Sequence, residues 1–164
     1  MTGKSKYFPI TLGLILLYLS GPSVIAQVPP STHEVLAYEG LFKAVITRDH
    51  DKLKSLISST KNIDARDDYG RTALHLAVYT ANHDAMRSLV KAGANPDVLE
   101  HDYYDVVTIA AVANDLDTLR LSLKLGCSPK NVTSRYDGTA LIAAAHLGHV
   151  EVVQTLIDAG APLD

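Results

Sequence analysis

The amino-acid sequence predicts an all-α solenoid, in which about four helix-turn-helix units stack along one axis. The first observation is that glycines recur at a spacing of 33 or 34 residues, at Gly93, Gly126 and Gly160. The second is that the small and aliphatic residues of 72–77 align, at the same spacing, with a segment in each of the next two units. A fixed period near 33 residues indicates stacking, because one unit of this size cannot bury its apolar face alone.

Each unit is expected to contain a polar turn, a short first helix and an amphipathic second helix. The turn is typified by residues 67–70, whose Asp, Tyr and Gly favour a tight reversal of the chain. Thr72 and Thr139 follow at positions where a hydroxyl can cap a helix start. Residues 140–145 are all small or aliphatic, which predicts a first helix packed on several sides. A glycine follows each amphipathic segment and favours the left-handed conformation that ends a helix.

Four segments resemble the ankyrin-repeat consensus closely. In the second unit they are Thr-Ala-Leu-His-Leu-Ala at 72–77 and Ala-Gly-Ala-Asn at 92–95. In the fourth unit they are Gly-Thr-Ala-Leu at 138–141 and Gly-His-Val-Glu-Val-Val at 148–153. The resemblance implies a stack whose units project β-hairpin or turn fingers along one edge.

The resemblance covers nearly all of the chain after residue 33 and divides it into four repeats. Their expected ranges are 34–66, 67–99, 100–132 and 133–164. The match is weaker in the first repeat, where Thr60 replaces the glycine, and in the third, where Asp105 replaces the threonine.

The N-terminal residues have the pattern of an export signal. Residues 1–26 contain two lysines, then an apolar run at 8–19, then a small-residue tail at 24–26. This order predicts a secretory signal peptide, since the run is shorter than the roughly 20 residues that cross a bilayer; an uncleaved anchor is the alternative. Residues 27–33, with Pro29-Pro30, are expected to form a linker. The mature protein is therefore predicted in the periplasm or outside the cell, without stable membrane insertion.

Charge and cysteine content restrict the class of partner. The chain has a net charge of −3, and the leader contributes two lysines and no acidic residue, so the remaining chain is two units more negative. This balance argues against a nucleic-acid partner and permits a protein partner with a basic or mixed surface. Cys127 is the single cysteine, which excludes an intrachain disulfide and a cysteine-rich zinc site. It is expected to pack as a small apolar residue.

The sequence predicts neither an enzyme nor a cofactor or metal site. His146, His149 and Glu151 have a spacing that suggests metal ligands, but two of them match the ankyrin consensus at the start of a second helix. The resemblance also implies that His75 hydrogen-bonds a neighbouring loop, although a general base is the alternative. The sequence contains no phosphate-binding glycine loop, nucleophile elbow or redox cysteine pair.

Tyrosines are concentrated in the predicted turns between helix pairs. They are Tyr69, Tyr103, Tyr104 and Tyr136. On projecting fingers these rings would line up about one repeat apart, and tyrosine is enriched at protein interfaces. The alternative is that each ring lies flat over its own hairpin.

Acidic residues accompany these tyrosines and are expected to make the finger edge negative. The fingers contain Asp67, Asp68, Glu100, Asp102 and Asp105 against Arg71 and Arg135. Glu100, Asp102, Arg71 and Arg135 are the charged residues predicted to contact a partner with a basic patch.

A groove is expected behind the fingers, lined by the last turn of each first helix. Its predicted lining is Tyr79, Val112, His146 and Leu147. These side chains and the finger residues form the predicted protein-binding surface.

The leader, the repeats and the stretch from Arg135 to His146 resemble the small ankyrin proteins of the bacterial periplasm. That resemblance implies a protein that binds or stabilises a partner, with a role in supporting a catalase or in resistance to peroxide. The alternative is a secreted effector or toxin-neutralising protein that acts outside the cell.

The C-terminal repeat is expected to lack a polar cap. Residues 162–164 stop where the repeat pattern would begin its next turn, and terminal repeats normally carry a polar outer face. Leu141, Val153 and Leu156 are therefore expected to be partly uncovered. Continuation into a further repeat is the favoured interpretation, and cover by a partner or another copy is the alternative.

Overall fold

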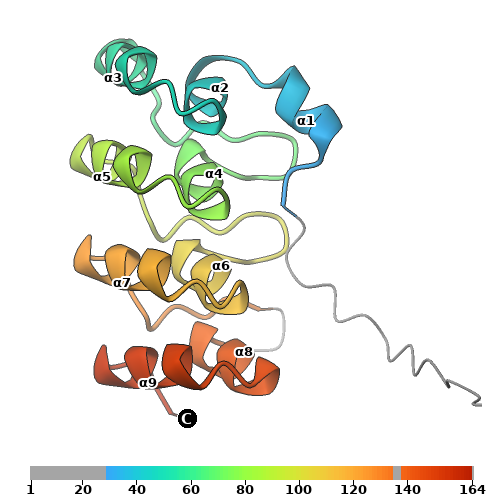
Figure 1. Ribbon diagram of the computed structural model, residues 1–164, viewed down its shortest axis with the longest axis vertical. Coiled ribbons are helices and arrows are strands. Elements are labelled where there is room, and N and C mark those ends of the chain that lie inside the picture. Colours follow the sequence, from blue (N-terminus) through green and yellow to red (C-terminus); the bar gives the residue numbers. More distant parts are fainter. Residues whose placement is uncertain (1–28, 135–137, 164) are drawn as a thin grey trace, which may run out of the picture.

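A computed structural model describes residues 29–134 and 138–163 of the chain as a stack of paired helices (Figure 1). The described residues form nine helices and no strand. They are α1 (Thr32–Ala37), α2 (Gly40–Ile46), α3 (His50–Ser59), α4 (Ala73–Tyr79), α5 (His83–Lys91), α6 (Val106–Val112), α7 (Leu116–Lys124), α8 (Ala140–Leu147) and α9 (Val150–Asp158). From α2 onward the helices pair in chain order, and each pair packs on the next. The predicted all-α stack of about four units is confirmed.

The first helices α2, α4, α6 and α8 form one layer of the stack, and the second helices α3, α5, α7 and α9 form the other (Figure 1). The long connections between pairs lie beside the first layer, on the side away from the second helices. Within the described residues, these connections are closed by turns rather than by extended strands.

Three first helices begin at a side chain that caps the backbone. Thr72 and Thr139 accept a hydrogen bond from the N–H three residues later, each at 3.4 Å, as their sequence positions predict. Asp105 occupies the same position in α6 and accepts from the N–H of Thr108 at 2.8 Å. An aspartate therefore replaces the consensus threonine without loss of the cap, because both supply an acceptor oxygen.

The apolar core lies between the two layers and between successive pairs. Its largest fully buried side chains include Leu53, Leu74, Leu76, Met86, Leu89, Ile109, Leu119 and Leu156. Helices α4 and α6 are buried along almost their whole length, because a first helix lies on each side of them. The prediction of packing on several sides is wrong for α8, where Ile142 is 53% exposed, since no described helix covers that side.

Helix α1 begins inside the segment that was expected to be a linker. Ser31 caps it and exchanges hydrogen bonds with Glu34, which forms a capping box. Such a box stabilises a short helix start that periodicity does not reveal. The helix lies on the same side of the stack as the connections between pairs (Figure 1). The predicted signal peptide lies outside the described residues, and none of the helices described there is long and apolar enough to span a membrane.

The expected exposure at the C-terminal repeat is partly wrong. Leu156 is fully buried and Leu141 is 6% exposed, because α8 and α9 pack against each other and against the preceding pair. Val153 is half-buried, as expected. The strongly exposed apolar side chains there are instead Val150 and Leu163, each 77% exposed.

Asn82 joins the first two helix pairs and offers a test of how the stack is held together. Its side-chain oxygen caps α5 by accepting from the N–H of Ala85 at 3.2 Å, and its amide donates to the carbonyl of Val45 at 2.8 Å. Asn82→Ala should lower the free energy of unfolding by about 2–3 kcal/mol, because it removes a cap and leaves a buried carbonyl unpaired. Urea denaturation followed by circular dichroism measures this loss.

The matched control is Asp49→Ala, which removes a cap from α3 that makes no bond to another helix pair. Its expected cost is about 1 kcal/mol. Equal losses in the two variants would show that the bond from Asn82 to Val45 contributes nothing.

Candidate functional site

The first finger is a tight turn from Asp67 to Arg71. The carboxylate of Asp67 accepts hydrogen bonds from the N–H groups of Tyr69 and Arg71, both at 2.9 Å. Gly70 has a φ of +78°, and a Cβ there would lie 2.6 Å from the ring of His101. The N–H of His101 also donates to the carbonyl of Tyr69 at 2.9 Å. Gly70 therefore permits both the left-handed turn and the close contact with the following finger.

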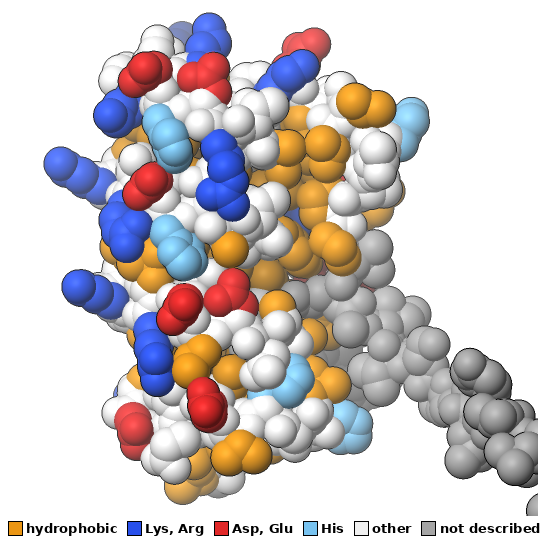
Figure 2. Space-filling model, viewed as in Figure 1, with side chains coloured by type: hydrophobic (Ala, Val, Ile, Leu, Met, Phe, Trp, Pro, Cys, Tyr) orange, Lys and Arg blue, Asp and Glu red, His pale blue; other side chains and the backbone are white. Residues whose placement is uncertain are grey.

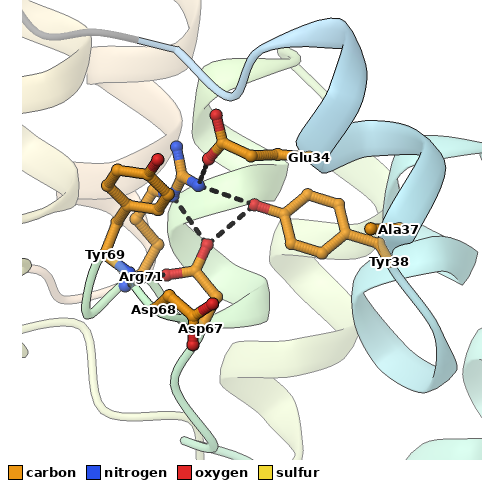
Figure 3. A pocket seen from close by; sticks show the side chains of 7 residues that line it. All are labelled: Glu34, Ala37, Tyr38, Asp67, Asp68, Tyr69 and Arg71. Atoms are coloured by element: carbon orange, nitrogen blue, oxygen red, sulfur yellow. Dashed lines mark hydrogen bonds and ion pairs between the residues drawn. The ribbon is translucent and has the colours of Figure 1, made fainter.

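Arg71 connects the first finger to α1 (Figure 3). Its Nε donates to Asp67 at 2.7 Å, and its Nη2 donates to the hydroxyl of Tyr38 at 2.8 Å and to the carboxylate of Glu34. The hydroxyl of Tyr38 in turn donates to Asp67 at 2.7 Å. Two carboxylates and one phenol thus satisfy a guanidinium that is almost wholly buried.

The electrostatics of this cluster favour its charged form. Burial alone would raise the pKa of Glu34, but hydrogen bonds from Ser31 and Arg71 lower it to about 2. Burial likewise opposes the charge on Asp67, and bonds from Tyr38 and Arg71 lower its pKa below the usual range. Burial and the neighbouring Asp67 raise the pKa of Tyr38. The carboxylates are therefore ionised and the phenol is protonated at neutral pH.

The prediction that Arg71 contacts a partner is wrong for the folded chain. Arg71 is only 3% exposed, because Glu34 of α1 and Asp67 of the finger enclose it. The ring of Tyr69 also covers its guanidinium, with 4.5 Å between the Arg71 Cζ and the ring centroid (Figure 3). The alternative that a ring lies over its own hairpin thus holds for Tyr69, although half of the residue remains exposed.

The second finger, from Glu100 to Tyr104, repeats the first turn with different side chains. The carboxylate of Glu100 accepts from the N–H groups of Asp102 at 3.0 Å and Tyr104 at 3.1 Å. Glu100 is therefore 7% exposed and does not stand at the fingertip, contrary to the sequence prediction. Asp102 is exposed, as expected. Burial raises the pKa of Glu100, and the charge of Asp102 adds to that rise against the two backbone hydrogen bonds.

Tyr103 occupies the position of the second finger that Gly70 occupies in the first. Its φ is +69°, a left-handed conformation that costs residues with a Cβ roughly 1–2 kcal/mol. Its side chain is 42% exposed, so little burial offsets that cost. Strained residues that are exposed concentrate at functional sites.

The expected groove is only partly formed. Tyr79 and Val112 are half-buried, and His146 and Leu147 are exposed. A cavity of about 220 Å³ between the second finger and α8 brings His146 together with Tyr104. Ile142, one helical turn before His146, also lines this cavity. The sequence prediction omitted Ile142, although its spacing of four residues from His146 places both on one helix face.

Two predicted contacts and one acidic residue have different outcomes. Arg135 and Tyr136 lie outside the described residues. Asp105 does not lie at the acidic edge, because it is 1% exposed and caps α6. The side-chain amide of Asn131 also donates to Asp105 at 2.8 Å.

The remaining histidines and the cysteine have structural roles where the structure describes them. Nδ1 of His75 accepts from the N–H of Thr72 at 3.0 Å, so its Nε2 carries the proton and donates to the carbonyl of Val98 at 3.0 Å. Burial lowers the pKa of His75 to about 4. The predicted loop contact of His75 is confirmed. Cys127 is 4% exposed, as predicted, and burial raises the pKa of its thiol to about 12.

His146, His149 and Glu151 do not converge. Nδ1 of His149 lies 3.0 Å from the carbonyl of Ala111 and donates to it, so this ring joins the third and fourth helix pairs. Within residues 29–134 and 138–163, no three His, Cys, Asp or Glu side chains are placed to hold a metal ion.

The stacked helix pairs and their fingers define a solenoid repeat protein. A family model described as ankyrin repeats (many copies) matches residues 41–90 and 107–157, which together exceed half of the chain. The chain therefore belongs to the ankyrin repeat family. A comparison with curated proteins found no match.

The cluster around Arg71 predicts a loss of stability in acid. Because the pKa of Glu34 falls from 4.5 to about 2 on folding, its stabilising contribution is complete above pH 4.5 and is lost as the pH falls toward 2. Glu34→Gln should lower the free energy of unfolding by about 2 kcal/mol at pH 7, since it breaks a charge-assisted bond to a buried arginine. The variant should also show a weaker dependence on pH across that window. Urea titrations at several pH values measure both effects.

Glu39→Gln is the control, because Glu39 precedes α2 but makes no side-chain cap and no ion pair in the described chain. It should unfold like the wild type at pH 7. If Glu34→Gln matched this control, the proposed linkage would be wrong.

The left-handed backbone at Tyr103 predicts an unusual ranking of variants. Tyr103→Gly should be more stable than Tyr103→Ala by about 1 kcal/mol, because only glycine removes the steric cost at that φ. At Tyr69, whose φ is not positive, the ranking should reverse. Thermal denaturation of the four variants checks the two rankings, and alanine above glycine at Tyr103 would contradict the strain.

Proposed function

We propose that this ankyrin chain is an exported module that binds a partner protein and stabilises it. Ankyrin repeats typically serve as non-catalytic scaffolds for protein-protein interaction, and that general function is the one that family membership suggests. The finer parts of the proposal are export, the binding surface and the role of the partner.

The proposal rests chiefly on the exposed aromatic and apolar side chains on the finger side of the stack. Tyr69 and Tyr103 are 51% and 42% exposed on neighbouring fingers. Ile142 is 53% exposed and lines a cavity together with Tyr104 of the second finger. Large side chains that remain exposed next to a hollow favour protein contact, because they supply apolar area with few rotatable bonds.

The charge distribution supports a partner with a basic or mixed surface. Asp68 and Asp102 are exposed on the two fingers. The exposed basic residues of the second helices include Lys54, Arg87, Lys91, Arg120 and Lys124. Figure 2 shows Lys and Arg side chains along the edge formed by these helices, away from the fingers. A basic partner would therefore be steered toward the finger side.

The leader pattern of residues 1–26 supports export. The resemblance to small periplasmic ankyrin proteins supports a location in the periplasm and a partner that handles peroxide, such as a catalase. In that role the module would bind the folded enzyme and raise its lifetime. Cells with and without this protein should then differ in the half-life of catalase activity in periplasmic extracts.

The same leader also supports the alternative, a secreted effector or toxin-neutralising protein. The two functions differ in where the mature chain accumulates. Recovery from the culture medium favours the secreted protein, and recovery from a periplasmic extract favours the catalase partner.

Affinity capture with fingertip variants tests the binding surface. The double variant Tyr69→Ala, Tyr103→Ala should lose its partner from a periplasmic extract, with an affinity lower by about tenfold or more, because buried tyrosines dominate many interfaces. Quantitative mass spectrometry of the captured proteins, followed by titration calorimetry with the main one, measures this loss.

The control is the double variant Lys91→Ala, Lys124→Ala, which changes exposed residues of the second helices. It should retain the partner. If every captured protein bound equally to both double variants, the fingertips would not be the binding surface.

A further inference from the structure

The two fingers have the same backbone frame, which makes their side chains comparable position by position. The N–H of Asp67 donates to the carbonyl of Arg71 at 2.9 Å, and the N–H of Glu100 donates to that of Tyr104 at 3.0 Å. Each acidic residue also accepts from the N–H groups two and four residues later. Tyr104 therefore stands where the first finger has Arg71.

The first finger shows how this frame holds a guanidinium. Arg71 lies over the ring of Tyr69, with its Nε on the carboxylate of Asp67 and its Nη2 on that of Glu34 (Figure 3). An aromatic face and carboxylates suit arginine better than lysine, because the guanidinium is planar and donates in two directions.

The second finger has the acidic and aromatic groups of such a site but lacks the arginine. Among the described residues, no Lys, Arg or His forms an ion pair with Glu100 or Asp102. Tyr79 and Tyr104 are the neighbouring rings. Burial raises the pKa of both tyrosines, and the charges of Glu100 and Asp102 raise it further, which places all four groups close together.

The site is reachable from outside. Asp102 is exposed, and Tyr104 is half-buried and lines the cavity of about 220 Å³ in front of α8. His146 and Ile142 form the opposite wall of that cavity. An extended side chain can therefore enter beside Tyr104 and reach the carboxylate of Asp102, with Glu100 behind it.

We propose that the base of the second finger, formed by Tyr79, Glu100, Asp102 and Tyr104, receives an arginine side chain from the partner protein. The inference rests on the proposed function and adds a recognition element to it. The guanidinium would stack on Tyr104 and pair with Asp102, as Arg71 does with Tyr69 and Asp67 in the first finger.

The test titrates the full chain, labelled with ¹⁵N, with N-acetyl-arginine methylamide and records amide chemical shifts. Saturable shifts are expected at Tyr79, Asp102 and Tyr104, with smaller shifts for the lysine analogue and none for the norleucine analogue. Asp102→Asn should weaken arginine binding by about tenfold, since it removes a charge-assisted bond. Asp68→Asn, an exposed change on the first finger, should leave it unchanged.

Substitution of Tyr104 provides a second test. Tyr104→Arg should abolish binding of the arginine analogue, because this chain would then fill the site as Arg71 fills the first finger. Tyr104→Phe, which keeps the ring, should bind as the wild type does. Well-dispersed amide spectra for both variants show that they are folded.

Three results would overturn the proposal: equal shifts for arginine and norleucine analogues, binding that Tyr104→Arg does not affect, or binding that appears only in Arg135→Ala. The last result would assign the site to an arginine of this chain. A captured partner that is lost with the fingertip tyrosines but retained by Tyr104→Arg would leave the proposed function standing without the arginine site.

Discussion

No helix pair of this chain can bury its apolar side chains without a neighbouring pair, and this constraint determines the whole stack. Polar side chains then fix how the pairs align. Asn82 bonds back to the carbonyl of Val45 in the first pair, and His149 bonds back to the carbonyl of Ala111 in the third. Each bond satisfies a carbonyl at the end of a first helix that the next pair would otherwise bury unpaired. Packing therefore supplies the attraction, and these bonds set the alignment.

The N-terminal side of the first finger is enclosed in a different way. There α1 covers Arg71 with Glu34 and Tyr38, so a buried cation is matched by two carboxylates and a phenol. Removal of one partner from such a cluster costs more than the cluster contributes, because it leaves a charge without water or a counter-ion. The first finger is consequently a fixed part of the scaffold, and the second finger is the first one with acidic and aromatic groups free of an arginine among the described residues.

The fold could be predicted from sequence because its signals are local and repeated. Spacing placed the helix pairs, and the caps at Thr72 and Thr139 follow from residue type. Helix α1 could not be predicted from periodicity, since it spans only Thr32–Ala37 and depends on the capping box of Ser31.

The candidate surface was less predictable, because it depends on burial. Arg71 and Glu100 have the composition of an exposed charged turn, yet both are buried by contacts with residues outside the turn pattern or with the turn's own backbone. The exposure of Ile142 depends on what lies beside α8, which no local pattern encodes. Composition thus located the fingers, and the structure sorted their side chains into those that hold the turn and those that face outward.

Three turns between paired helices contain a left-handed residue other than glycine, at Arg48, Ala81 and Asn114, whereas the fourth has Gly148. Each such residue makes the folded stack less stable than a glycine with relaxed sterics would allow. The chain therefore stands below its attainable stability, and a partner that binds only the folded form adds to it by mass action. Because linkage is reciprocal, protection runs in both directions: the lifetime of the module in the cell rises with the amount of partner present, and the lifetime of the partner rises with the amount of the module.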